Sequence, residues 1–287
     1  MTLPAALPGE RLRYEGLHCY VDGSGPPLLL VHSVNAAASA AEVRPLYEHA
    51  RRTRTVFAPD LPGYGFSERI DRLYTPRLMT DALHATVRQI QARCGPAPVD
   101  ALAVSLGCEF LARAAVEQPA DFRRLALVSP TGFNGNAVRR GPPGSTRAVP
   151  GLHRVLSHPL WAQGLFKQLT RPGVVRFFLE KTWGGKAIDE AMYQYAVATA
   201  REPGARFAPL SFLGGGLFSA DIHSIYEALG QPVWASHGVR GDFTDYRGLA
   251  MISGRPNWRV SVLQTGALPY FELPAEFNAA MDAFFAD

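Results

Sequence analysis

The sequence predicts an α/β fold in which a mostly parallel sheet is flanked by helices and interrupted by an inserted helical cap. Short apolar runs alternate with longer segments whose apolar residues recur at helical spacing, as in consecutive βαβ units. This alternation stops after Phe133 and resumes at Gln231, which indicates an insertion. With 287 residues, of which 47% are hydrophobic and 19% charged, the chain has enough apolar material for one large core.

The apolar runs have the length and composition of buried parallel strands. They are residues 28–31, 55–58, 99–104, 125–128, 233–236 and 260–263. Between them, residues 40–50, 79–93 and 109–118 have helical periodicity. Near the amino terminus, residues 12–31 contain two strand-like runs around the turn Asp22-Gly23-Ser24-Gly25, so we expect the sheet to open with an antiparallel hairpin.

The break in the alternation sets the expected domain boundaries. Residues 1–133 and 226–287 are predicted to form the core domain, and residues 134–225 the cap. The predicted helices of the cap are residues 156–169, 174–181, 187–199 and 220–229. A stretch rich in Gly and Pro, residues 141–151, is the expected mobile connection.

Composition limits the classes of partner and cofactor. The net charge of +4 is spread thinly, which argues against nucleic acid as a partner. Cys19, Cys94 and Cys108 follow no metal or disulfide spacing, so we expect no metal, no cofactor and a reducing compartment. No apolar run is long enough to cross a bilayer, and the expectation is a cytoplasmic protein without a membrane partner. The sequence leaves open whether it is a monomer or a homodimer.

The strongest local signal for chemistry is a serine that directly follows a buried strand. Residues 99–104 run into Ser105, and the small residues Ala103 and Gly107 lie two positions to either side. A sharp turn from strand to helix needs small neighbours, because larger side chains would collide with the sheet or the helix. A serine at the end of a strand is by itself more often a helix cap than a nucleophile, so the interpretation depends on its context.

Two further landmarks supply that context. The strand at residues 28–31 ends in His32-Ser33-Val34-Asn35, and the next strand ends in Asp60-Leu61-Pro62-Gly63-Tyr64-Gly65-Phe66-Ser67. In the second segment, the Gly and Pro residues favour a tight turn, and Asp60 and Ser67 can satisfy its backbone groups. With Ser105, these segments resemble the α/β-hydrolase superfamily, in which the first loop is His-Gly and the turn is Asp-x-x-Gly-x-Gly-x-Ser.

The resemblance implies a serine-hydrolase site. Ser105 would be the nucleophile, and the backbone N–H groups of Val34 and Leu106 would form the oxyanion hole, while the His32 ring would brace the loop. The triad acid would follow the strand at residues 233–236. Asp242 is the first choice and Asp245 the reserve.

The histidine of the triad is missing. Residues Thr265-Gly266-Ala267-Leu268-Pro269-Tyr270-Phe271-Glu272-Leu273-Pro274 resemble the closing segment Gly-His-x-x-x-x-Glu-x-Pro of the superfamily, with Ala267 in place of the base. Serine is a poor nucleophile without an imidazole, and loss of that imidazole costs on the order of a million-fold in turnover. The chain is therefore expected to be nearly inactive. It is either an active hydrolase disabled at one position, which we favour, or a protein that has abandoned hydrolysis.

Three functions remain open. The favoured one is an esterase-like serine hydrolase acting on a small-molecule acyl substrate. The alternatives are a carbon-carbon bond hydrolase of the meta-cleavage product type and a non-catalytic ligand-binding homologue. The cap is rich in aromatic residues, which favours an apolar or aromatic acyl group, although many of these rings are expected simply to fill the cap core. Phe177, Trp183 and Phe212 are the predicted substrate-binding side chains.

Overall fold

A computed structural model describes residues 3–241 and 243–286. Its described residues form an eight-stranded sheet with the spatial order β1-β2-β4-β3-β5-β6-β7-β8. The last six strands in this order are parallel, and β1 and β2 run antiparallel at one edge. The strands are β1 Glu10–Tyr14, β2 Leu17–Asp22, β3 Pro27–Val31, β4 Thr55–Asp60, β5 Val99–Val104, β6 Phe122–Val128, β7 Val233–Gly238 and β8 Trp258–Leu263. The predicted fold class is confirmed.

The hairpin at the edge of the sheet turns at a different place from the one predicted. It joins β1 to β2 through Glu15 and Gly16, both of which have positive φ, as a two-residue hairpin turn with the twist of the strands requires. The predicted turn at residues 22–25 instead leads from β2 to β3, and these strands do not pair because β4 lies between them.

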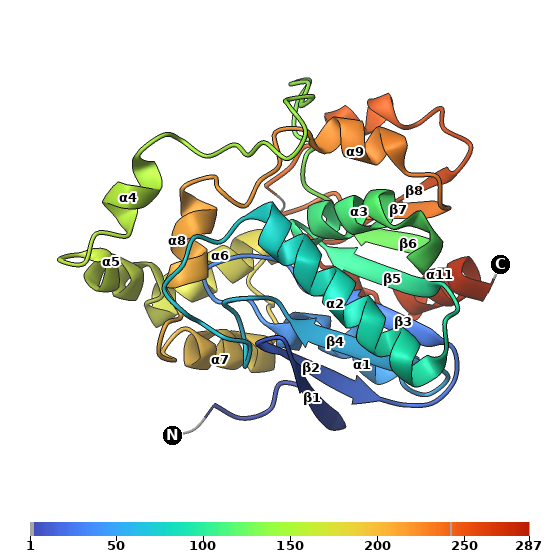
Figure 1. Cartoon of the computed structure of the whole chain (residues 1–287), viewed down its shortest axis with the longest axis horizontal. Helices are drawn as coiled ribbons and strands as arrows, with labels where there is room; N and C mark the ends of the chain where they lie inside the picture. The colour runs from blue at the N-terminus through green and yellow to red at the C-terminus, as the bar shows by residue number, and fades with distance from the viewer. Residues whose placement is uncertain (1–2, 242, 287) are drawn as a thin grey trace.

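Helices cover both faces of the sheet (Figure 1). On one face, α2 (Pro76–Cys94), α3 (Gly107–Glu117) and α9 (Ile222–Ala228) pack over a large apolar cluster that includes Leu29, Ala101 and Leu127. On the other face, α1 (Arg44–Ala50) and α11 (Pro274–Ala286) cover a second cluster. Single helical turns also occur at η1 (Ala40–Val43), η2 (Pro119–Asp121), η3 (Arg247–Met251) and α10 (Pro269–Glu272).

The cap helices α4–α8 lie together at the end of the sheet where the parallel strands finish (Figure 1). They are α4 Leu152–Leu156, α5 Ala162–Leu169, α6 Pro172–Trp183, α7 Glu190–Thr199 and α8 Phe207–Leu213. The single helix expected at 156–169 is divided in two, and Pro159 lies in the break. Helix α8 was not predicted. Helix α9 (Ile222–Ala228), predicted as a cap helix, packs on α3 and joins the core instead.

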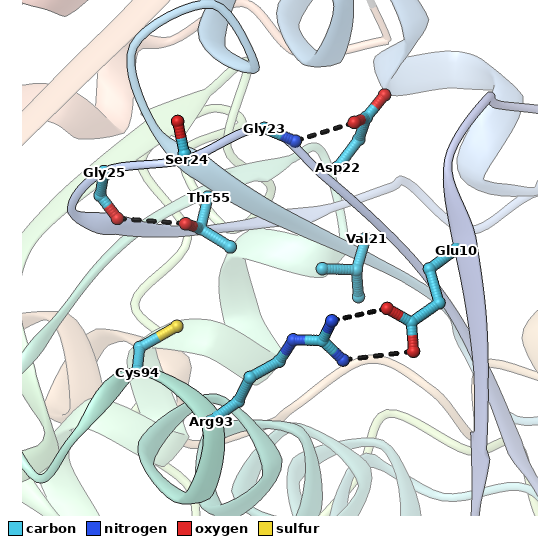
Figure 2. Close-up of a pocket in the computed structure, with 9 residues that line it drawn as sticks. All are labelled: Glu10, Val21, Asp22, Gly23, Ser24, Gly25, Thr55, Arg93 and Cys94. Carbon is cyan, nitrogen blue, oxygen red and sulfur yellow. Dashed lines mark hydrogen bonds and ion pairs between the residues drawn. The ribbon is translucent and has the colours of Figure 1, made fainter.

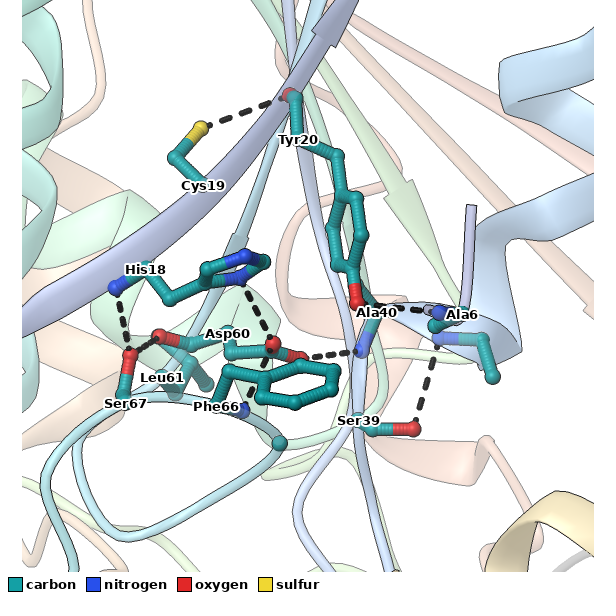
Figure 3. A network of polar contacts seen from close by, with 12 residues as sticks. Ala6, His18, Cys19, Tyr20, Ser39, Ala40, Asp60, Leu61, Phe66 and Ser67 are labelled. Carbon is teal, nitrogen blue, oxygen red and sulfur yellow. Dashed lines mark hydrogen bonds and ion pairs between the residues drawn. The ribbon is translucent and has the colours of Figure 1, made fainter. Parts of the chain in front are cut away.

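A buried polar network holds the turn that follows β4 (Figure 3). The Asp60 carboxylate accepts hydrogen bonds from the backbone N–H groups of Ala40 and Phe66, at 2.9 and 3.0 Å, and contacts the His18 ring at 3.1 Å. The Ser67 hydroxyl donates to the Asp60 carbonyl and accepts from the His18 N–H. Asp60 and Ser67 therefore satisfy backbone groups of the turn as predicted, and they tie it to β2 and η1.

This network predicts that Gly65→Ala will destabilise the protein. Gly65 has a φ of +51°, and a Cβ added there would lie 1.9 Å from the Asp60 carboxyl carbon. Left-handed backbone strain and overpacking together should lower the free energy of unfolding by about 2–5 kcal/mol. The measurement is urea denaturation followed by circular dichroism.

Gly164→Ala is the matched control, because no atom lies within 4 Å of a Cβ at that helical position. It should leave stability unchanged or raise it by up to about 1 kcal/mol. Equal stability of the two variants would contradict the proposed role of Gly65.

Candidate active site

Ser105 occupies a strained turn between β5 and α3. Its φ of +52° places a non-glycine residue in the left-handed region, as expected for the sharp turn from strand to helix. Its N–H donates to the Val128 carbonyl at 2.8 Å, which ties the turn to β6. A Cβ at Gly107 would lie 2.6 Å from the His32 carbonyl oxygen, so only glycine fits there. The half-buried Ser105 is thereby held at the carboxyl end of the sheet.

The two predicted oxyanion donors are without acceptors in the described part of the chain. Val34 and Leu106 are 4% and 1% exposed, and neither N–H donates a hydrogen bond to a described residue. Buried N–H groups without acceptors are rare in folded proteins. Leu106 follows Ser105 along the chain, and Val34 lies in the loop after β3, the strand that pairs with β5.

The His32 ring fixes the direction of one donor. Its Nε2 accepts the Leu61 N–H at 2.9 Å, so the ring proton must lie on Nδ1, which donates to the Ser33 carbonyl at 2.5 Å. The peptide between Ser33 and Val34 is planar and trans, so a fixed carbonyl also fixes the opposite direction of the Val34 N–H. Burial lowers the pKa of His32, which favours the neutral ring that this arrangement needs.

A carboxyl group that sequence analysis missed holds the same loop. Glu42, on η1, accepts the Ser33 N–H at 2.5 Å and the Ser33 hydroxyl at 2.7 Å. Burial raises the pKa of Glu42 to about 7, while the hydrogen bonds from Ser33 oppose this shift. Ser33 therefore has a partner of its own, and this explains how a residue other than glycine is accommodated in the loop.

Ala267 and its neighbour Gly266 are held by hydrogen bonds to their backbone groups. The Ala267 N–H donates to the Thr182 carbonyl at the end of α6, at 2.8 Å, and its carbonyl accepts the Ser129 hydroxyl at 2.6 Å. The N–H of Gly266 donates to the carboxylate of Glu272, which also pairs with Arg240. Ala267 is 6% exposed and lies between the cap and the strand next to Ser105.

Of the two candidate triad acids, the structure describes only the reserve, Asp245. Asp242 falls outside the described residues. Asp245 is on the surface, where its carboxylate accepts hydrogen bonds from the Gly135 N–H at 2.7 Å and from Arg247 Nε at 2.6 Å. These bonds, that from Gly135 first, lower the pKa of Asp245. His237, near the end of β7, stacks on Tyr246 with ring centroids 3.9 Å apart, so its ring is engaged in packing.

The three predicted substrate-binding rings have different surroundings. Trp183 is buried and packs against Phe271, beside the Ala267 segment. Phe212 packs against Phe218 at the border of the core. Phe177 is 59% exposed, because α6 directs Leu179 and Trp183 inward and turns Phe177 toward solvent. Phe177 therefore lies at the surface of the cap, and its contact with a substrate stays a prediction.

Two surface hollows lie away from Ser105. One lies where β3 and β4 begin, at the opposite end of these strands from the site, and is bordered by the Glu10–Arg93 ion pair and Cys94 (Figure 2). Cys94 is exposed, whereas Cys19 and Cys108 are buried. The other lies between the turn at Gly65 and the cap residue Glu202.

The described residues hold no group of three His, Cys, Asp or Glu side chains suited to a metal ion. Within the same residues, no helix is both long and apolar enough to cross a bilayer.

Ser129 is a second residue that sequence analysis missed. It follows β6 as Ser105 follows β5, and it too has a positive φ, +48°. Each strand ends at a valine that a serine follows, as Val104-Ser105 and Val128-Ser129. This repeated pattern could have identified Ser129. Nothing in the sequence marks Glu42, because its partner Ser33 belongs to another loop.

The fold, with its strained turn from β5 to α3 at Ser105, defines a class of α/β protein, and comparison with known proteins places the chain in a family. The family described as alpha/beta hydrolase fold matches residues 26–169, half of the chain. The chain belongs to the α/β-hydrolase family. A search of proteins with curated functions found no match.

Solved structures agree on the fold. One is the 2-hydroxy-6-oxo-6-phenylhexa-2,4-dienoate hydrolase of Rhodococcus sp. strain RHA1, 20% identical, with a TM-score of 0.71 over 94% of this chain and 95% of that one. Another is the epoxide hydrolase CorEH, 22% identical, with a TM-score of 0.73 and coverage of 96% and 98%. A third is the meta-cleavage product hydrolase CumD of Pseudomonas fluorescens IP01, 15% identical, with a TM-score of 0.72 and 97% coverage of both chains. At these identities the similarity establishes the fold alone.

The buried Glu42 predicts a pH dependence of stability. Its folded pKa of about 7 lies above the ordinary 4.5, so between these values the folded protein binds more protons than the unfolded chain, and stability falls as pH rises. Glu42→Gln is neutral throughout. Relative to the original chain, its free energy of unfolding should therefore rise by up to about 3 kcal/mol from about pH 5 to about pH 8.

Urea denaturation across this range measures the effect, with Glu48→Gln, an exposed position on α1, as the control. If the free energies of unfolding of the original chain and of Glu42→Gln changed with pH in parallel, the extra proton of the folded protein would not be bound at Glu42.

Proposed function

We propose that the site is a serine-hydrolase acyl site and that the chain as it stands binds its substrate without cleaving it. The observation that carries this proposal is the pair of buried, acceptor-free N–H groups of Val34 and Leu106 beside a strained Ser105. Such donors suit the oxygen of an acyl carbonyl, which becomes negatively charged when the carbonyl is attacked. An ester of an apolar or aromatic acid is the substrate class we favour.

The missing step is proton transfer. The Ser105 hydroxyl makes no hydrogen bond to a described residue, and a methyl group occupies the position of the base at Ala267. His32 is not a substitute, because both of its ring nitrogens are engaged by backbone groups. Without a base, the oxyanion donors and binding alone supply roughly a thousand-fold acceleration over water. Asp242 would orient a restored imidazole.

The second candidate is a carbon-carbon bond hydrolase, and the similarity of the fold to the meta-cleavage product hydrolase CumD supports it. The carboxylate of such a substrate would need a cationic side chain of the cap as its partner. Arg176 is engaged elsewhere, since it pairs with Glu190 and lies over the Tyr193 ring. Arg171 remains as the candidate. A ligand-binding homologue without catalysis is the third possibility, and it differs from the first in its response to a restored histidine.

We predict that Ala267→His will raise kcat for aryl esters by at least about a thousand-fold. The new imidazole would take the proton of Ser105 as it attacks, and would then protonate the leaving group. The measurements are steady-state hydrolysis of a panel of aryl esters and vinylogous diketo acids, and labelling of Ser105 by a fluorophosphonate. Cleavage of the diketo acid alone would favour the second candidate.

Two controls separate the explanations. Ala267→Asn tests whether a polar side chain without a base gives the same gain, and Ala267→His combined with Ser105→Ala tests the nucleophile. Folded Ala267→His protein without activity on any substrate would remove hydrolysis and favour the ligand-binding function. Activity that survives the loss of Ser105 would instead refute the nucleophile assignment.

A further inference from the structure

Helices α4 and α5 and their flanks carry apolar side chains that the rest of the protein leaves uncovered. No residue of α4 is buried, although three of its five residues are apolar. Leu160 is 85% exposed and Trp161 46%, while Val149 and Val155 are each 56% exposed. Figure 1 shows α4 and α5 projecting at the far end of the cap helices. Exposed apolar side chains gathered in one place indicate a binding surface.

The same region has a one-sided charge. Residues 134–179 contain seven Lys and Arg residues and no Asp or Glu. Two of the seven, Arg140 and Arg176, pair with acidic residues outside this segment. Arg154, Lys167 and Arg171 are exposed and form no ion pair with a described residue. These three cations and the four exposed apolar residues Val149, Val155, Leu160 and Trp161 are called the α4–α5 surface.

The orientation of Trp161 is fixed locally. Its indole Nε1 donates to the Val155 carbonyl at 2.8 Å, and its ring stacks on His158 with centroids 4.3 Å apart. The indole N–H therefore has its acceptor within the protein, while part of the ring is exposed to solvent. Because the ring is already held in place, binding through it would cost little further side-chain entropy. Tryptophan with leucine and cations nearby is typical of segments that lie at a membrane interface.

We propose that the α4–α5 surface docks on an anionic lipid bilayer. Leu160 and Trp161 would enter the boundary between headgroups and acyl chains, and Arg154, Lys167 and Arg171 would contact the anionic headgroups. The sequence predicts no membrane partner because no apolar run in it is long enough to cross a bilayer, but binding to a bilayer surface needs no such run. This proposal does not rest on the proposed function of Ser105.

Charge argues against a second copy of the chain on this surface. A symmetric dimer through it would bring two copies of the same patch together, with Arg154, Lys167 and Arg171 on both sides and no Asp or Glu within residues 134–179 to offset the repulsion. An anionic bilayer offsets all three cations at once. Its fluid surface also accepts apolar side chains of irregular arrangement, such as those on two short helices and their connection.

The test is titration with vesicles of phosphatidylcholine alone and of phosphatidylcholine mixed with phosphatidylserine. Trp183, Trp234 and Trp258 are buried, so a blue shift of the tryptophan emission on mixing reports Trp161. We expect this shift, together with sedimentation of the protein, only with the anionic vesicles, and we expect raised salt to reverse both. Trp161→Phe should lose the shift but still sediment.

Two variants test the two parts of the surface. Leu160→Ser should weaken binding by at least about tenfold, through lost apolar burial. Arg154→Glu combined with Lys167→Glu should weaken it by at least about tenfold, through lost attraction. Val262→Ser, at a position 56% exposed on the edge strand β8, is the matched control and should bind normally.

Three results would overturn the proposal: no binding to anionic vesicles, equal binding to neutral ones, or unchanged binding by both surface variants. Concentration-dependent self-association that Leu160→Ser abolishes, without vesicle binding, would assign the surface to a second copy instead.

Discussion

The left-handed turn at Ser105 is the constraint on which the carboxyl edge of the sheet depends. A positive φ costs about 1–2 kcal/mol in a residue with a side chain, so the surroundings must hold it in place. Val128 accepts its N–H, and Gly107 lets α3 approach the His32 carbonyl closely. The loop after β3 must therefore lie against the start of α3. This contact brings the Val34 N–H to the region of the Leu106 N–H.

From the contact between the loop after β3 and the start of α3, hydrogen bonds extend in two directions. Toward β4, the His32 ring links Ser33 to Leu61, and Asp60 then links the next turn to η1. Toward β6, Ser129 reaches the carbonyl of Ala267, whose N–H binds the last turn of α6. These hydrogen bonds connect the cap, the turn at Ser105 and the segment around Ala267. The position of each of the three is therefore restricted by the other two.

The sequence predicted those parts of the fold whose environment is local and buried. Residues 99–104 form β5 with the limits expected, because five of the six residues are apolar and Ser105, with its left-handed φ, ends the strand. The hairpin turn was misplaced because both Glu15-Gly16 and residues 22–25 have turn chemistry, and only the insertion of β4 beside β2 decides between them. Helix α9 was grouped with the cap because helical periodicity does not say which surface a helix covers, and Phe133 and α3 provide that surface. Glu42 was missed for a similar reason, since its partner lies in another loop.

The network around Ala267 explains how a triad position can lose its side chain while the loop keeps its shape. Thr182 and Ser129 bind the N–H and carbonyl of residue 267, and Glu272 binds the N–H of Gly266, so none of these contacts uses the side chain at 267. An imidazole at this position would contribute chemistry and little structure. Meanwhile the strain at Ser105 and Ser129 and the two acceptor-free N–H groups remain, each with a cost in stability. Within our proposal, a chain that retains these costly features without a base is better suited to hold an acyl group than to release it.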